Sequence, residues 1–144
     1  MKTAAVIGFT LANALLAHAQ TDAGPTPSRF DGSWVVRISC PSHTEASAAK
    51  GYSYNFPATV SGGVIVGRYR AEGDVPSLGI EGAIQPNGSA VLHAHGRTGE
   101  REYAVKHPSV GTPYKYTIHA QFDTRRGTGS RVEDRVCDFV FTRK

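Results

Sequence analysis

Apolar and polar residues alternate in short stretches along most of the chain after residue 30. In the stretch 33–40, Trp34, Val36, Ile38 and Cys40 share one parity, and mostly smaller or polar residues share the other. A period of two is typical of a β-strand that buries one face. By this pattern we expect eight strands, at 33–40, 52–60, 63–70, 77–84, 89–97, 102–107, 114–122 and 135–143.

The links between these stretches contain turn-forming sequences. Ser-Gly-Gly, Glu-Gly-Asp and Pro-Asn-Gly separate successive predicted strands, and the chain holds 16 glycines and 8 prolines. Links of hairpin length join neighbouring antiparallel strands. The sequence therefore predicts an all-β, antiparallel, up-and-down arrangement.

One short helix is expected after the first strand, at 43–50. Ser42 and Glu45 have the spacing of a capping box, and three alanines follow within the next four residues. Gly51 is suited to end the helix. We expect two helical turns across one end of the sheet.

The two ends of the domain show matching patterns. If Cys40 lies opposite Cys137 in an antiparallel pair, the large apolar residues of both strands fall on one face, and a shift by one residue would destroy this agreement. The pairs so predicted are Trp34 with Arg143, Val36 with Phe141, and Ile38 with Phe139. Pairing of the first and last strands closes an eight-stranded barrel. A two-sheet sandwich would use much the same pattern.

Two short motifs resemble those of a known group of barrels. Gly32-Ser33-Trp34 opens the first strand and Phe141-Thr142-Arg143 ends the last, a pattern similar to that of the calycins, which include lipocalins and avidins. This resemblance implies that Trp34 and Arg143 form a structural pair that seals one end of the barrel. No biotin-binding residue of the avidins can be matched to this chain.

The mature chain also resembles a group of small exported proteins from rhizobia and related bacteria. These begin with Phe-Asp-Gly-x-Trp, here 30–34, and end with an aromatic strand that contains a cysteine. The group has no established activity to carry over.

The N-terminus has the features of a secretory signal peptide, which we place at 1–19. Lys2 precedes an apolar run at 4–16, and small residues stand at the expected cleavage site before Gln20. We expect a flexible leader at 20–29 and a single barrel domain at 30–144. A retained N-terminal anchor is the alternative. The protein is expected to be periplasmic or secreted.

Export bears on the two cysteines, Cys40 and Cys137. In an oxidising compartment two cysteines far apart in sequence favour one structural disulfide over a catalytic thiol. The net charge of +4 is small and its basic residues are scattered, which disfavours nucleic-acid binding. After the leader no segment is long and apolar enough for a membrane-spanning helix.

Two further patterns are compatible with a site but do not predict one. His93 and His95 share the outer face of one predicted strand, but we expect His119 two strands away, so exposed polar residues are favoured and a metal binder that uses this pair is only a third possibility. The segment 127–130 is glycine-rich and lies among arginines, but it lacks the lysine of a phosphate-binding loop, so we expect a solvated hairpin tip.

Catalysis is likewise not expected. Motifs of the nucleophile-elbow, nucleotide-binding and zinc-protease kinds are missing from the sequence. Among the candidate carboxylates, Glu81 and Glu102 have outward parity, and no pair with Glu100 is expected inside the barrel. We therefore expect a protein that is not an enzyme and needs no cofactor.

The predicted inner face is rich in tyrosine. The candidates for ligand binding are Tyr52, Tyr54, Tyr103, Tyr114 and Tyr116. A buried tyrosine hydroxyl needs a partner, so these residues suggest either a lumen with water or ligand, or rings that fill the core with hydroxyls at the barrel mouth. The sequence leaves both possibilities open.

The leading hypothesis is an exported binding protein that holds a small, partly apolar ligand among these tyrosines. The alternative is a protein-binding module, such as a hydrolase inhibitor, that acts on an extracytoplasmic protein through the loops 108–113 and 124–131. In the first case the interior is open, and in the second it is filled.

Overall fold

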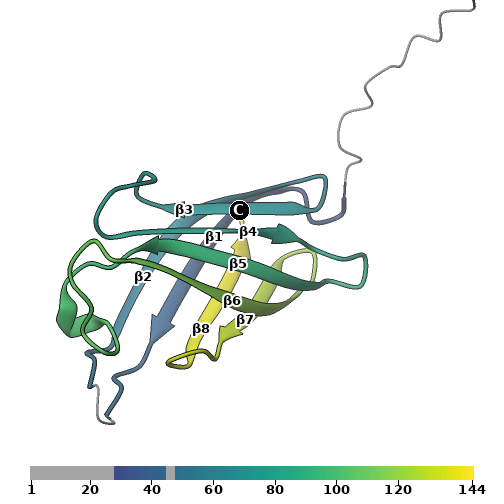
Figure 1. Ribbon diagram of the computed structural model, residues 1–144. Coiled ribbons are helices and arrows are strands. Elements are labelled where there is room, and N and C mark those ends of the chain that lie inside the picture. Colours follow the sequence, from purple (N-terminus) through teal and green to yellow (C-terminus); the bar gives the residue numbers. More distant parts are fainter. Residues whose placement is uncertain (1–27, 45–47) are drawn as a thin grey trace, which may run out of the picture.

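The structure, a computed structural model, describes residues 28–44 and 48–144. Eight antiparallel strands follow one another around a closed barrel in chain order, and β8 pairs with β1 (Figure 1). The strands are β1 (Gly32–Cys40), β2 (Tyr52–Ser61), β3 (Val64–Tyr69), β4 (Ser77–Ala83), β5 (Ser89–Arg97), β6 (Pro113–Phe122), β7 (Arg126–Arg131) and β8 (Cys137–Arg143). The predicted up-and-down barrel is confirmed, and the sandwich alternative is not.

The seam between β1 and β8 has the register predicted from the sequence. Trp34 lies opposite Arg143, Val36 opposite Phe141, and Ile38 opposite Phe139. At the end of this ladder Cys40 and Cys137 form the expected disulfide, which joins residues 97 positions apart. In the chain-entropy description, a cross-link over such a long loop stabilises the folded state by about 4 to 5 kcal/mol.

The inward-facing residues of all but one strand form a continuous apolar core. Trp34, Ile65, Leu92, Ile118 and Phe141 are fully buried and come from five different strands. Along β1 and β6 the buried positions follow the predicted alternation. Burial of a large side chain of this kind contributes about 2 to 3 kcal/mol, so this core is the main source of stability.

The two ends of the barrel differ in the length of their connections. At one end the strands are joined by the short links 62–63, 84–88 and 123–125, and we refer to it as the closed end. The other end, the open end, gathers the links 41–51, 70–76, 98–112 and 132–136, of which the first three are longer than any link at the closed end (Figure 1). The open end therefore has more chain available to shape a site.

Strand β7 was not predicted, because its sequence reads as a turn. The segment 126–131 pairs with β6 on one side and β8 on the other, so it is not a hairpin tip. Gly127 and Gly129 face inward, where a Cβ on Gly127 would lie 2.6 Å from the ring of Phe122 and one on Gly129 would lie 2.9 Å from Ala120. Neighbouring side chains fill the space that this strand leaves empty.

The strand predicted at 102–107 is wrong. Residues Arg101–Tyr103 form a 3-10 turn, η1, and Lys106 and His107 have positive φ angles of 65° and 45°. Such angles are incompatible with a continuous strand. β5 pairs directly with β6 along nine residue pairs, so 102–107 belongs to the loop over the open end.

The helix predicted at 43–50 is also wrong. His43 and Ala49 form an isolated antiparallel bridge, with two backbone hydrogen bonds of 2.9 and 3.0 Å between them. A bridge of this kind requires extended backbone at both residues, so neither can belong to a helix. Residues 45–47, which include Glu45 of the expected capping box, lie outside the described part.

The predicted signal peptide and most of the predicted leader lie outside the described residues as well. Ser28 and Arg29, assigned to the leader, belong to a turn against the barrel, where Arg29 donates a hydrogen bond of 3.0 Å to the carbonyl of Pro86. No helix within 28–44 and 48–144 has the length and hydropathy needed to cross a membrane.

Candidate functional site

The closed end is sealed by packed aromatic rings. Trp34 is completely buried, and Phe122 contacts it edge to face with ring centroids 5.7 Å apart. Phe30 and Phe141 also pack against Phe122. Rings packed in this way leave little space between the described residues of the closed end.

Trp34 and Arg143 both hold the turn that covers this end. The indole Nε1 of Trp34 donates to the carbonyl of Phe30 at 2.9 Å, and the guanidinium of Arg143 donates to the carbonyls of Arg29, Asp31 and Thr124. The structural pairing is as expected, but the contact differs. Arg143 lies beside Trp34 in the sheet, and its guanidinium contacts backbone carbonyls. Among the described residues it forms no cation–π contact with the indole of Trp34.

Asp31 anchors the same turn to the link between β2 and β3. Its carboxylate accepts hydrogen bonds from the Ser28 hydroxyl at 2.6 Å and from the backbone N–H groups of Gly62 and Gly63 at 3.0 Å each. These bonds, with that of Ser28 the largest contributor, hold the pKa of Asp31 well below its usual range. The closed end is thus fixed by polar contacts as well as by packing.

The open end contains a cavity of about 520 Å³ that opens to solvent. All six tyrosines of the chain line it, and none of the described phenylalanines does. A volume of this size lies within the range of small-molecule sites in proteins. The six are Tyr52, Tyr54, Tyr69, Tyr103, Tyr114 and Tyr116.

The tyrosine rings form two groups on the cavity wall. Tyr114 and Tyr116 of β6 are stacked with centroids 5.9 Å apart, and Tyr54 of β2 contacts Tyr52 at 5.8 Å and Tyr69 of β3 at 4.2 Å. The predicted inward direction is correct for the four strand tyrosines. Tyr69 was missed, although it continues the inward parity of β3 after Ile65 and Gly67.

Tyr103 reaches the cavity in a different way from the one predicted. It comes from η1 rather than from a strand, is 37% exposed, and contacts the ring of Tyr52 at a centroid distance of 6.4 Å. It therefore lies at the rim of the cavity.

Burial favours the neutral form of four of the cavity tyrosines. Burial raises the pKa of Tyr52, Tyr54, Tyr114 and Tyr116 above the ordinary value, and for Tyr54 the surrounding tyrosines add to the effect. The hydroxyl of Tyr114 donates to the carbonyl of Ser77 at 2.7 Å. Those of Tyr52 and Tyr54 have no hydrogen-bond partner within the described residues and remain available to a ligand or to water.

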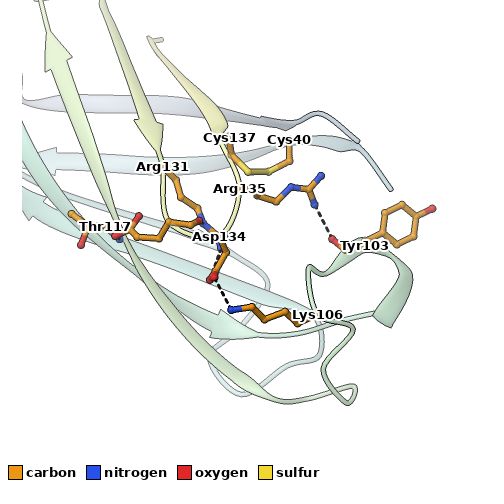
Figure 2. A network of polar contacts seen from close by, with 9 residues as sticks. Cys40, Tyr103, Lys106, Thr117, Arg131, Asp134, Arg135 and Cys137 are labelled. Atoms are coloured by element: carbon orange, nitrogen blue, oxygen red, sulfur yellow. Dashed lines mark hydrogen bonds and ion pairs between the residues drawn. A yellow bond between two sulfur atoms is a disulfide. The ribbon is translucent and has the colours of Figure 1, made fainter. Parts of the chain in front are cut away.

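Two arginines that the sequence did not single out as ligand contacts also line the cavity. The guanidinium of Arg131 lies 4.1 Å from the ring centroid of Tyr116, and that of Arg135 lies 5.5 Å from that of Tyr52. Arg131 is the last residue of β7, and Arg135 belongs to the link 132–136 (Figure 2). The inward parity of Gly127 and Gly129 would have pointed to Arg131, had β7 been predicted.

The wall of the cavity is held by contacts among the long links. The backbone N–H of Lys50 donates to the carbonyl of Glu102 at 2.7 Å, and their side chains form an ion pair of 2.9 Å. Arg135 donates to the carbonyls of Pro41, Lys50 and Tyr103, so it joins three of the four links. Figure 2 shows this arginine beside the disulfide.

The outer-face histidines lie on two neighbouring strands. With 102–107 outside the sheet, β5 and β6 are adjacent, so His119 is on the neighbouring strand of His93 and not two strands away as expected. Even so, no group of three potential ligands close enough for a metal ion occurs within 28–44 and 48–144.

The candidate carboxylates are separated. Glu81 is exposed on the outer face of β4 and Glu102 is bound to Lys50, whereas Glu100 lines the cavity together with Asp134. Asp134 forms ion pairs with Lys106 at 3.2 Å and with Arg131 at 3.6 Å (Figure 2).

The loops of the alternative hypothesis lie at opposite ends of the barrel. Residues 108–112 belong to the open end, and the link 123–125 belongs to the closed end. The remainder of the expected loop 124–131 is β7. These segments do not form one surface.

Comparison of the chain with protein-family models, with curated proteins and with solved structures found no match in any of the three. The resemblance to calycins therefore stands on the closed eight-stranded barrel and on the seam at Trp34 and Arg143. The resemblance to exported rhizobial proteins gains no support from these comparisons.

Proposed function

We propose that the protein is an exported, non-catalytic binding protein that holds one small, partly apolar molecule in the cavity at the open end. The observation that carries this proposal is the placement of all six tyrosines around that cavity. Tyrosine offers an apolar ring face for contact and a hydroxyl for hydrogen bonding, and both uses fit a ligand better than they fit a filled core.

The polar groups of the interior support the same reading. The rings at the closed end pack against one another, while the hydroxyls of Tyr52 and Tyr54 lack partners among the described residues. Neither hydroxyl is among the fully buried polar atoms that lack a partner there, so both face the space of the cavity and not the packed core. A ligand with hydrogen-bonding atoms supplies what the tyrosines lack.

Export is proposed from the signal-peptide pattern at 1–19, and the disulfide fits it. The absence of catalysis is proposed because Asp134, one of the two carboxylates on the cavity wall, is engaged by two cations. The proposed site residues remain the tyrosines named from the sequence, with Tyr69 added.

The proposal can be tested by native mass spectrometry of the full chain, expressed with its own leader and purified without denaturation. We expect a bound mass of a few hundred daltons that is released on unfolding. In parallel, titration with N-phenylnaphthylamine, a neutral aromatic fluorophore, is expected to show saturable binding at one site per chain.

Variants locate this binding. Tyr54→Ala and Tyr116→Ala are expected to weaken the fluorophore by about tenfold or more while the near-UV circular dichroism signal of Trp34 is retained. Val91→Ala, on the exposed outer face of β5, is the matched control and should bind normally. A protein that carries no bound mass and shows no saturable titration would contradict the proposal and favour a protein-binding scaffold.

A further inference from the structure

The charged residues around the cavity are unevenly balanced. Four cationic side chains and two carboxylates line it, and the cations extend from the rim to the interior. They are Arg97, Lys106, Arg131 and Arg135, against Glu100 and Asp134. The wall therefore carries an excess of positive charge, although the net charge of the whole chain is only +4.

Arg135 is the most deeply buried of these cations. It is 5% exposed, and no carboxylate pairs with it among the described residues. Its terminal nitrogens reach backbone carbonyls, but its Nε has no hydrogen-bond partner in the described part of the chain. A buried, uncompensated cation is costly unless an opposite charge comes near it.

Arg131 adds a second cation with incomplete compensation. Its side chain is 14% exposed, and its ion pair with Asp134 is long, at 3.6 Å. The same carboxylate lies closer to Lys106, at 3.2 Å. Burial is the largest effect on the pKa of Arg135 and lowers it. The charge of Arg131 also lowers this pKa, whereas Tyr52 raises it by less than burial lowers it. The two arginines thus repel each other across the cavity wall.

We propose that the ligand carries an anionic group, which binds beside Arg131 and Arg135 while its apolar body lies against the tyrosine rings. This inference rests on the proposed function and names the class of its ligand: a planar, apolar acid such as an aromatic carboxylate or sulfonate. The planar guanidinium of Arg131 can hold such a group through two hydrogen bonds. The neutral phenols of Tyr52 and Tyr54 can donate to the same oxygens.

A matched pair of probes separates this inference from the proposed function. Anilinonaphthalene sulfonate and N-phenylnaphthylamine share one ring system and differ in the sulfonate. We expect the sulfonate to bind the wild-type protein about tenfold more tightly than the neutral probe, because a charge-assisted contact has this order of strength. The advantage is expected to shrink as salt is added.

Two variants of opposite sign test the assignment. Arg131→Gln is expected to weaken the sulfonate by about tenfold and to change the neutral probe by less than about twofold. Asp134→Asn removes the carboxylate that competes for Arg131 and is expected to strengthen the sulfonate by about threefold. Asparagine suits the positive φ of 60° at this position, so the fold should tolerate it.

Arg125→Gln is the control for a change of one charge, because Arg125 is exposed in the link 123–125 at the closed end. It should leave both probes unaffected. If the neutral probe binds but the sulfonate has no advantage and Arg131→Gln has no effect, the anionic ligand is ruled out and the binding function stands. If neither probe binds in a saturable way, both proposals fail.

Discussion

The closed and open ends of this barrel are built from different aromatic residues. Three phenylalanines and the single tryptophan fill the closed end, and the tyrosines surround the cavity at the open end. Phenylalanine has no polar group, whereas the tyrosine hydroxyl and the tryptophan indole N–H need a hydrogen-bond partner when they are buried. At the closed end Trp34 has its partner in the carbonyl of Phe30, whereas two tyrosine hydroxyls at the open end have none among the described residues.

The comparison indicates that stability depends mainly on one end of the barrel and binding on the other. Short links and packed rings close the first of these ends. Long links at the open end are held by ion pairs and by the carbonyls around Arg135. Substitutions at the two ends should therefore affect stability and binding in opposite proportions.

Replacement of Trp34 by alanine should have the largest effect on stability. Because the indole is fully buried among rings, Trp34→Ala is expected to lower the free energy of unfolding by about 4 kcal/mol. Urea unfolding followed by far-UV circular dichroism measures this. A loss below that of Tyr54→Ala would contradict the division between the two ends.

Removal of the disulfide should be the next most damaging change. Cys40→Ala with Cys137→Ala is expected to cost about 3 kcal/mol, because the unfolded chain regains the freedom that the cross-link removes. This is less than the chain-entropy value of about 4 to 5 kcal/mol, because the unfolded chain is more compact than a random coil. The same urea experiment, with and without reductant on the wild type, provides the measurement. If reduction leaves the midpoint unchanged, the cross-link does not stabilise the open end.

The glycine strand tests how tightly the closed half is packed. Gly127→Ala places a methyl group 2.6 Å from the ring of Phe122, and we expect a loss of about 2 kcal/mol from overpacking. Thr128→Ala, exposed on the outer face of the same strand, is the control and should change stability little. Equal thermal midpoints for the two variants would show that Phe122 can move away freely.

Replacement of Tyr54 should reverse the pattern seen at Trp34. Tyr54 is half-buried beside the cavity, so Tyr54→Ala is expected to cost about 1.5 kcal/mol in stability while it removes most of the binding. Paired unfolding and titration experiments give both quantities. A variant that unfolds as readily as Trp34→Ala and still binds the neutral probe would refute the comparison.

The smallest effect concerns acid and the turn at Asp31. Because hydrogen bonds lower the pKa of Asp31 in the folded state, its ionised form stabilises the protein above the unfolded pKa of about 4, and this contribution is lost as the pH falls further. Asp31→Asn lacks this contribution at every pH. Its free energy of unfolding, measured by urea unfolding at several pH values, should therefore fall less than that of the wild type between neutral pH and strong acid. If the free energy of unfolding depends on pH equally in both proteins, the hydrogen bonds assigned to Asp31 are contradicted.

Much of the fold could be predicted because it depends on local alternation and one covalent constraint. The period of two assigned the inner faces of β1, β6 and β8, and pairing Cys40 with Cys137 set the register that closes the barrel. Four of the five proposed site tyrosines follow from the same parity. These features are repeated along several residues each, so a single departure does not hide them.

The segments that were misassigned depend on residues far away in sequence. Residues 102–107 alternate like a strand, but both edges of β6 are occupied, one by β5 and the other by β7, so these residues become part of the rim. The residues 126–131 have almost no side chains to mark an inner face, because the ring of Phe122 occupies the space above Gly127. In such short segments, the intrinsic preference of the residues for a strand or a turn has less influence on the structure than packing and pairing with the neighbouring strands.

By itself, then, the sequence determined the strand faces, the seam and the concentration of tyrosine in the interior, because alternation and pairing are properties of neighbouring residues. Only the tertiary structure decided that the tyrosines gather around a cavity at one end and that Arg131 and Arg135 join them. Arg135 is held by carbonyls of two other links, 41–51 and 98–112, which meet its own link only after the barrel has closed. The charge of a site is set by the groups that surround it in space, and those groups are not neighbours along the chain.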